Sequence, residues 1–202
     1  FLGVDAGAEE QVVARLACAG GDNVARNRSS YTGLTSCRGA DLIAGGGKAC
    51  FWGCLGLGDC ETVCDFDAIY MDQHGLPLVI EDKCTACGDC VDACPKDLFS
   101  LHPVSHRLWV ACKNLERGEK VIEDCQVGCD ACGRCAVDAP PGVINMVDNL
   151  PVVDYDRNHN AKEAIDRCPT GAIVWFDDKR GPVAGRAARR VIRQSARRAI
   201  NT

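Results

Sequence analysis

The sequence predicts an α+β protein made of tandem cysteine-rich modules with short hairpins and helices, plus small flanking α/β segments. Three observations lead to this fold class. Sixteen of the 202 residues are cysteines, a strand–turn–strand pattern occurs twice in the middle of the chain, and aromatic residues make up only 5%. Because so few aromatic side chains form a poor core, bound metal must supply much of the cohesion. We therefore expect folding to depend on metal.

Eight of the cysteines lie in one run, and the second half of that run has an informative spacing. It reads Cys-x-x-Cys-x-x-Cys-x-x-x-Cys-Pro from Cys84 to Pro95. In bacterial-type iron–sulfur proteins, three cysteines with this spacing hold one 4Fe-4S cluster, and the fourth reaches a neighbouring cluster. The spacing therefore predicts bound 4Fe-4S clusters and a protein that transfers electrons.

Zinc sites and disulfide frameworks fit the cysteine spacing less well. A structural zinc site needs two Cys-x2-4-Cys pairs separated by a spacer, which a triplet followed by Cys-Pro does not supply. Disulfide frameworks are typical of small secreted chains, whereas this chain is long enough for one or two domains and shows no secretory signal. A zinc-stabilised interaction module remains the less favoured alternative.

The strand–turn–strand pattern spans residues 65–84 and recurs at 140–158. Each copy is predicted to form the hairpin that joins the two cluster-binding halves of a dicluster ferredoxin. Two ferredoxin-like iron–sulfur modules are therefore expected in tandem. The predicted domains are an N-terminal α/β segment that contributes cysteines (1–48), a dicluster ferredoxin module (49–104), a degenerate single-cluster module (105–178) and a basic C-terminal tail helix (179–202).

Comparison of the two modules indicates which ligands the second one has lost. A shift of 74 residues takes the ligands of the Cys84 run to Asn158, Ala161, Ala164 and Cys168, and a shift of 75 takes Cys64 to Ala139. The four lost positions form the full ligand set of one cluster. Restoring cysteine at all four should therefore allow an additional cluster. The predicted sets are Cys50, Cys54, Cys60 and Cys94; Cys84, Cys87, Cys90 and Cys64; and Cys129, Cys132, Cys135 and Cys168.

Four cysteines remain outside these three sets. Residues 13–18 and 107–112 resemble each other, because each is a strand-like run that ends on a cysteine. A fourth 4Fe-4S cluster between two similar units is therefore predicted, and four buried thiols are the alternative. Its ligands are expected to be Cys18, Cys37, Cys112 and Cys125. Because Cys50 aligns with Cys125 in the repeat, Cys37 and Cys50 could exchange sets.

Charge divides the chain into an acidic body and a basic end. Residues 1–178 hold 28 acids and 15 bases, a net charge of −13, and the seven arginines and one lysine beyond Asp178 make up the remaining bases. Phosphate contacts need a basic surface, so the acidic body argues against nucleic acid as a partner. Residues 186–200 are predicted to form a helix that either docks on an acidic partner or an anionic membrane surface, or is simply solvated.

No further cofactor or active site is indicated. The chain has no run of eighteen apolar residues, so nothing in these residues is expected to span a bilayer. It also has neither a dinucleotide-binding Gly-x-Gly-x-x-Gly after a strand nor a Walker loop. The histidines are scattered and the carboxylates form no acid–base arrangement. We therefore expect no catalytic residue and a role in electron transfer alone.

The stretch at residues 37–69, with its Trp-Gly-Cys-Leu-Gly-Leu-Gly-Asp-Cys run, resembles the B subunit of the Rnf ferredoxin:NAD oxidoreductase in its long polyferredoxin form. Further matches lie at 110–114, 127–132 and 168–173. The resemblance extends over nearly all of residues 3–176. The amino-terminal membrane helix and the first Cys-rich domain of that family are not in these residues, and the basic tail is not part of the family pattern.

The resemblance implies a cytoplasmic, membrane-associated subunit that accepts electrons from a soluble ferredoxin and relays them to further cofactors. The expected partners are other redox subunits of a complex, such as a flavoprotein or a ferredoxin, and the expected place is the cytoplasmic face of the membrane. A free soluble polyferredoxin carrier is the alternative. The acidic body fits such a carrier, whereas the arginine-rich tail favours docking.

Overall fold

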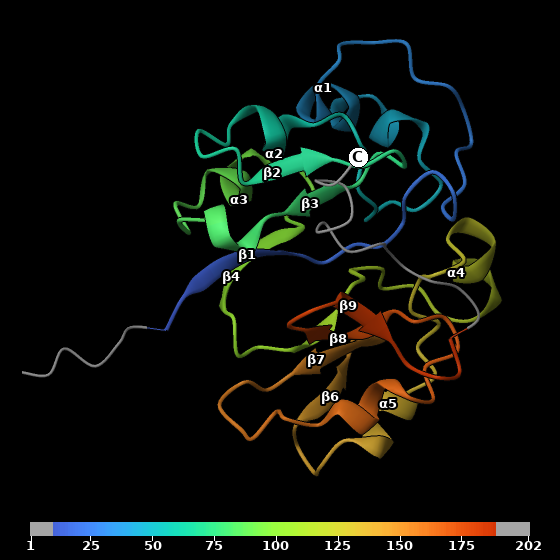
Figure 1. Ribbon diagram of the computed structural model, residues 1–202. Helices are drawn as coiled ribbons and strands as arrows, with labels where there is room; N and C mark the ends of the chain where they lie inside the picture. The colour runs from blue at the N-terminus through green and yellow to red at the C-terminus, as the bar shows by residue number, and fades with distance from the viewer. Residues whose placement is uncertain (1–9, 189–202) are drawn as a thin grey trace, which may run out of the picture.

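The computed structural model describes residues 10–188, and every helix and strand within them is three to six residues long (Figure 1). Short helices and antiparallel strands alternate along the chain, which confirms the predicted α+β class. We call residues 10–104 the first half and residues 105–188 the second half. Within the described residues, no helix is long and apolar enough to cross a membrane.

The first half begins and ends in the same two-stranded sheet. Strand β1 pairs antiparallel with β4, from Val12 opposite Pro103 to Leu16 opposite Phe99, and β2 forms a hairpin with β3. The β-branched residues of β1 favour an extended backbone. The elements are β1 (Val12–Leu16), α1 (Cys37–Leu42), the 3-10 helix η1 (Ala44–Gly47), α2 (Asp59–Thr62), β2 (Ile69–Met71), β3 (Pro77–Val79), the 3-10 helix η2 (Glu81–Lys83), α3 (Asp89–Ala93) and β4 (Phe99–Pro103).

The second half follows a similar order, with two fewer helical segments and one extra strand. Strand β5 pairs antiparallel with β8, β8 pairs with β9, and β6 forms a hairpin with β7. The elements are β5 (Leu108–Val110), α4 (Glu119–Asp124), α5 (Arg134–Asp138), β6 (Ile144–Val147), β7 (Leu150–Val153), the 3-10 helix η3 (Lys162–Ile165), β8 (Ile173–Asp177) and β9 (Gly181–Ala184).

Strand β9 corrects the predicted course of the C-terminal segment. Residues 179–202 were expected to be a tail helix, but Gly181–Ala184 continue the sheet beyond β8 because their backbone pairs with it, from Val174 opposite Ala184 to Asp177 opposite Gly181. The predicted helix at 186–200 lies almost entirely outside the described residues.

Both predicted hairpins are present, and local turn chemistry explains each one. In the first, the Asp72 carboxylate accepts hydrogen bonds of 2.8 Å from the amides of His74 and Leu76, which closes a longer turn. In the second, Asp148 and Asn149 both have positive φ, 47° and 68°. Two such residues form the tight turn that matches the twist of paired strands.

The two halves pack together through an apolar layer between them. Ala17 and Ala19, on either side of Cys18, lie in one buried cluster with Trp109 of β5, Val174 of β8 and Val127. The indole of Trp109 donates a hydrogen bond of 2.9 Å to the carbonyl of Leu16, and the ammonium group of Lys113 donates to the carbonyl of Asp97. Segments far apart in the sequence are therefore held side by side.

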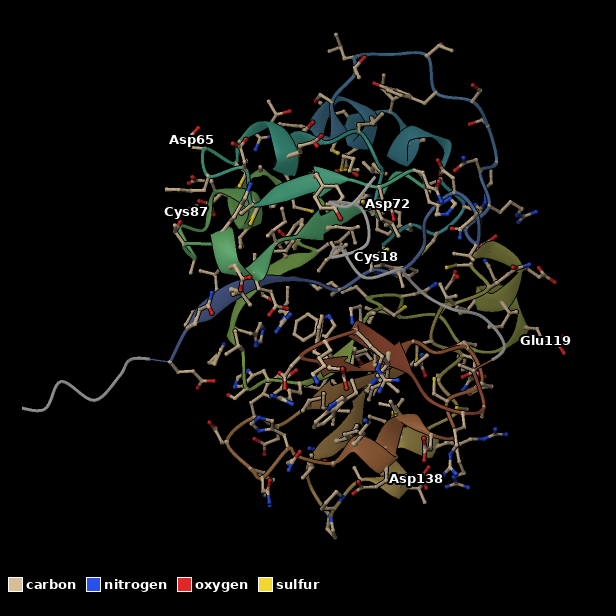
Figure 2. All side chains as sticks on the ribbon, in the orientation of Figure 1. Cys18, Asp65, Asp72, Cys87, Glu119 and Asp138 are labelled. Atoms are coloured by element: carbon tan, nitrogen blue, oxygen red, sulfur yellow. The ribbon has the colours of Figure 1, made fainter. Side chains whose placement is uncertain are left out.

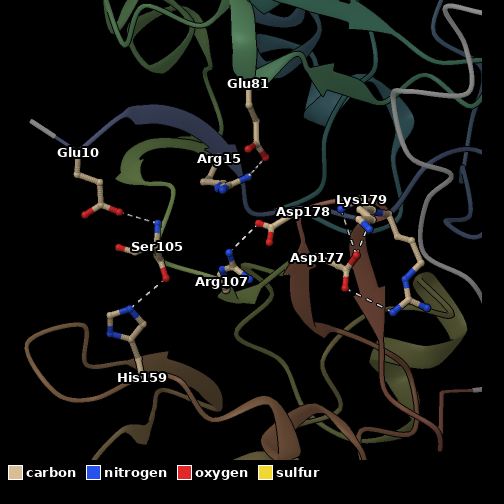
Figure 3. Close-up of polar contacts among 10 residues, drawn as sticks. Glu10, Arg15, Glu81, Ser105, Arg107, His159, Asp177, Asp178 and Lys179 are labelled. Atoms are coloured by element: carbon tan, nitrogen blue, oxygen red, sulfur yellow. Dashed lines mark hydrogen bonds and ion pairs between the residues drawn. The ribbon is translucent and has the colours of Figure 1, made fainter. Parts of the chain in front are cut away.

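Polar contacts surround a cavity of about 780 Å³ at this junction (Figure 3). The Glu10 carboxylate accepts a 2.8 Å hydrogen bond from the amide of Ser105, whose carbonyl in turn lies 3.3 Å from the His159 ring. Arg107 forms a 2.7 Å ion pair with Asp178. No cysteine lines this cavity, so it is separate from the thiol groups described next.

Candidate metal centres

Three loops with cysteines share one backbone conformation. They span residues 54–60, 84–90 and 129–135. In each loop, the residues on either side of the middle position (57, 87 or 132) have positive φ. A short helix with a buried cysteine then follows. Such alternation turns successive N–H groups toward one side of the loop, which favours a negatively charged group there.

Two of these loops adopt the conformation without glycine at the first of the two positions. Ala86 and Ala131 have φ of 56° and 61°. A left-handed conformation costs an L-residue about 1 to 2 kcal/mol. Strain of this kind persists where the surrounding structure over-determines it, and it concentrates at functional sites.

The first group of thiols, set I, lies at one end of the first half. Its members line a common space against Ala14 and Phe66, and the amide of Ala14 donates a 3.4 Å hydrogen bond to the sulfur of Cys84. Cys87 is exposed, at the edge of the molecule in Figure 2. Set I comprises Cys64, Cys84, Cys87 and Cys90.

The second group, set II, lies beside set I and is enclosed by Leu16, Met71 and Leu98. The amide of Leu98 donates a 3.4 Å hydrogen bond to the sulfur of Cys94. Helices α2 and α3 connect the two sets. Helix α2 carries Cys60 of set II and precedes Cys64 of set I by two residues, and α3 carries Cys90 of set I and is followed directly by Cys94 of set II. Set II comprises Cys37, Cys54, Cys60 and Cys94.

The third group, set III, lies between the two halves and takes two cysteines from each. The sulfur of Cys18 accepts hydrogen bonds from the amides of Gly20 and Cys54, at 3.4 and 3.5 Å. The sulfur of Cys112 accepts in the same way from Asn114 and Cys129, both at 3.4 Å. Set III comprises Cys18, Cys50, Cys112 and Cys125.

The structure thus exchanges Cys37 and Cys50 relative to the favoured assignment and adopts the alternative that the repeat left open. Two antiparallel bridges explain the place of Cys50. Ala25 bridges Cys125, and Asn27 bridges Lys48. These pairings bring the residues just before Cys50 to the chain segment that already lies against Cys125.

A carboxylate explains the place of Cys37. The side chain of Asp59 accepts hydrogen bonds from the amides of Cys37 and Arg38, at 2.8 and 3.1 Å. Because Asp59 and Cys60 are neighbours at the start of α2, this contact fixes the first turn of α1 beside set II rather than set III.

The fourth group, set IV, lies in the second half and agrees with the predicted set. Three of its members are buried in the apolar cluster of that half, and Cys132 is exposed. Burial raises the pKa of Cys135 to about 11, and the neighbouring Cys168 thiol contributes to this rise. Set IV comprises Cys129, Cys132, Cys135 and Cys168; burial raises the pKa of the first three, and the nearby Cys168 thiol adds to each rise.

Three of the four positions that lack cysteine in the second half are occupied by buried alanines. Ala161 and Ala164 are fully buried and Ala139 is 8% exposed, in one cluster with Ile144 and Ile165. The fourth position, Asn158, is exposed.

Burial dominates the acid–base behaviour of these thiols. It raises the pKa of Cys50, Cys60, Cys112 and Cys129 to about 12. Each of these thiols is therefore protonated at neutral pH until a metal displaces the proton, so that metal binding is coupled to proton release. Four soft thiolates per site are the donor set of iron–sulfur clusters.

A single metal ion fits the geometry less well than a cluster. Among residues 10–188, no group of three or more His, Cys, Asp or Glu side chains converges closely enough to hold one ion. The thiols of sets I, II and III instead surround spaces, and amide N–H groups point at their sulfurs. This arrangement fits a polynuclear cluster.

Comparison with known proteins agrees with this chemistry. The 4Fe-4S dicluster domain family matches residues 48–98. The chain is 40% identical over 173 residues to the B subunit of the Na(+)-translocating ferredoxin:NAD(+) oxidoreductase complex of Acetobacterium woodii, a match that covers 86% of this chain and 52% of the relative. It is 41% identical over 166 residues to the B subunit of the proton-translocating ferredoxin:NAD(+) oxidoreductase complex of Clostridium ljungdahlii, covering 81% of this chain and 58% of the relative.

A third relative extends the match to Methanosarcina acetivorans. The B subunit of its ion-translocating oxidoreductase complex is 31% identical over 173 residues, which cover 86% of this chain and 66% of the relative. The chain therefore spans from about half to about two thirds of the length of these relatives. The chain is a homologue of the B subunits of Rnf-type, ion-translocating ferredoxin:NAD oxidoreductases and contains a 4Fe-4S dicluster domain.

Proposed function

We propose that the chain is a relay that carries low-potential electrons through four 4Fe-4S clusters between a ferredoxin or flavoprotein and the other redox subunits of an Rnf-like complex. One observation carries the proposal: all sixteen cysteines fall into four sets of four. Neighbouring sets are linked, II to III through the Cys54 amide and Cys18 sulfur, and III to IV through the Cys129 amide and Cys112 sulfur.

The two halves are proposed to be tandem ferredoxin-like modules, of which the second retains one cluster. The shared order of strand, cysteine loop, hairpin and closing strand supports this reading. In this scheme the N-terminal segment supplies Cys18 and Cys37 to clusters that the modules also bind. Its strand β1 completes the first module by pairing with β4.

Each part of the chain has a defined role in the relay. A bound 4Fe-4S cluster supplies one-electron transfer. The loops fix the distances between the four sets. The amides that donate to sulfur stabilise the negative charge that reduction adds, whereas burial disfavours that charge. The four sets form a row in the order I, II, III, IV. Cys87 of set I and Cys132 of set IV, at its two ends, are exposed, so electron partners are expected to dock there.

The proposed location is the cytoplasmic face of the membrane, in contact with partner subunits. This part of the proposal rests on the names of the relatives, which are subunits of ion-translocating complexes. The excess of acids over residues 1–178 argues for a protein partner rather than nucleic acid.

Anaerobic electron transfer tests the function directly. Reduced dicluster ferredoxin is mixed with the purified, oxidised chain, and bleaching of the chain's visible absorbance is followed. We expect about four electrons to be accepted per chain, one for each cluster. A chain that accepts none from ferredoxin or from dithionite contradicts the proposal. A chain that accepts them but never associates with a flavin-containing subunit is the free carrier instead.

A further inference from the structure

The three similar cysteine loops differ at one position. In the repeat, Cys54 aligns with Cys84 and Cys129, and Cys60 aligns with Cys90 and Cys135. The middle position holds Cys87 in the second loop and Cys132 in the third. In the first loop it holds Leu57.

The backbone around Leu57 is nevertheless that of a ligand loop. Gly56 and Gly58 flank it with φ of 74° and 82°, as Ala86 and Gly88 flank the middle position of the second loop with 56° and 95°. A helix then begins directly after the second left-handed residue in both loops. The first loop has therefore kept the conformation of a three-cysteine loop while lacking the middle cysteine.

A distant thiol lies at the place where the local one is absent. Cys37 lines the same space as Cys54 and Cys60, beside Gly58 and Asp59 of the first loop. Asp59 also holds the first turn of α1 through its carboxylate, which accepts from the Cys37 amide at 2.8 Å. The same short segment therefore positions the helix and lines the space that its cysteine lines.

Residues 29–46, which carry Cys37, form a long loop that leaves the first half and returns to it; we call this loop the excursion. Its ends meet, since the amide of Arg28 donates a 2.7 Å hydrogen bond to the carbonyl of Gly47. Its middle is held by a 2.5 Å ion pair between Asp41 and Lys96, a lysine whose side chain is only 8% exposed. Lys96 follows Cys94-Pro95, so the ion pair joins the excursion to another member of set II.

We propose that Cys37 replaces the ligand lost at Leu57, and that residues 29–46 form a cover that brings this ligand to set II and closes the site from solvent. The inference rests on the proposed function, because it assigns a ligand to one of its clusters. Sets I and IV each expose their middle cysteine, whereas Cys37, within residues 29–46, is half-buried. Electrons then enter and leave at the ends of the row and not at set II.

Moving the ligand back tests the replacement. Cys37→Ala is expected to lose one cluster, about four of about sixteen iron atoms, together with one electron paramagnetic resonance signal. Adding Leu57→Cys to this variant should restore both. Cys37→Ala with Thr62→Cys, which places the new thiol at an exposed position of α2 outside set II, is the matched control and should restore neither.

Two results would overturn the replacement. Full iron and unchanged spectra in Cys37→Ala would show that Cys37 is no ligand. A Cys37→Ala/Leu57→Cys chain that keeps the other three signals but does not regain the fourth would show that position 57 is not equivalent to Cys87. The unmodified chain is measured first, and fewer than four clusters there contradicts the proposed function rather than this inference.

Removing the excursion tests the cover. A chain with Leu57→Cys and residues 29–46 replaced by Asn-Gly should fold, because Arg28 and Gly47 are already paired and Asn-Gly favours a tight hairpin. We expect this chain to contain as much iron as the unmodified chain. Ferricyanide should abolish its set II signal at least ten times faster than the set II signal of the unmodified chain. A rate equal to that of the unmodified chain would show that residues 29–46 do not shield set II from solvent.

Discussion

The two halves of the chain use different means to stabilise similar topologies. In the first half, the apolar cluster is built around the cysteines of sets I and II, together with Leu76, Leu98 and Phe99. In the second half, the region equivalent to set I is filled by alanines and isoleucines, and a third strand, β9, widens the sheet. The comparison teaches that hydrocarbon packing can occupy the region where the first half has set I, so the halves should differ in their need for iron.

Complete removal of iron should therefore have the largest effect, and it should fall on the first half. With an iron chelator under anaerobic conditions, we expect amides of β2, β3 and β4 to exchange at least a hundredfold faster, which corresponds to about 3 kcal/mol. Amides of β6 and β7 should change less. Hydrogen exchange read by mass spectrometry measures both regions in one sample, and equal acceleration in the two hairpins would contradict the comparison.

Loss of one ligand in the second half should be more local. Cys168→Ala removes a member of set IV, so iron should fall by about a quarter and one resonance signal should disappear. The signals of sets I and II should persist, because the Cys84 to Cys94 loop is untouched. Thr170→Ala, which alters the neighbouring hydroxyl 3.8 Å from the Cys168 sulfur, is the matched control and should keep full iron.

Restoring the lost cysteines should have a smaller effect on iron than the repeat alone suggests. The residues equivalent to Ala86 and Gly88 are Asn160 and Lys162, and neither has positive φ. Without that loop conformation the N–H groups do not converge on one side. We expect the chain with cysteine at all four lost positions to gain no cluster, as iron analysis will measure, and a gain of about four iron atoms would show that the loop can still rearrange.

A small effect of pH is expected at the junction between the halves. The Nδ1 atoms of His102 and His106 lie 3.0 Å apart, and burial lowers the pKa of His102 from 6.5 to about 4, helped by His106 and Arg15. A depressed histidine pKa means that the unfolded chain binds the proton more readily. The junction should therefore weaken as pH falls from 6.5 toward 4.

Limited proteolysis of the linker at residues 104–107 measures this effect. Cleavage should accelerate from about pH 7 to about pH 5 in the unmodified chain and accelerate less in His102→Gln. The visible absorbance is checked at each pH so that acid loss of clusters is recognised. The other charged groups facing the pair are Glu10 and His159. An identical pH profile in both chains would remove His102 as the cause.

The sequence revealed the parts of the site that depend on local spacing. The loop from Cys84 to Cys94 and the two hairpins were predictable, because their ligands and turn residues are close together in the chain. The sets containing Cys37 and Cys50 were not fixed, since they depend on the bridge between Asn27 and Lys48 and on the contact of Asp59 with α1. Long-range pairings of this kind leave no periodic signal.

Strand β9 was missed for a related reason. Gly181-Pro-Val-Ala offers only a short apolar stretch next to many basic residues, so charge favoured a tail. Its extended conformation comes from pairing with β8, whose Val174 and Trp175 are buried and lie opposite Ala184 and Val183. Tertiary context decided the outcome where local propensity was weak.

The iron content of the unmodified chain tests the central claim most directly. Protein prepared without oxygen should contain about sixteen iron and about sixteen acid-labile sulfide atoms per chain, four of each for every set of thiols. A reproducible value near twelve would contradict the account. It would mean that set III holds no cluster, so that its thiols are only buried thiols and no cluster connects set II with set IV. These thiols are Cys18, Cys50, Cys112 and Cys125.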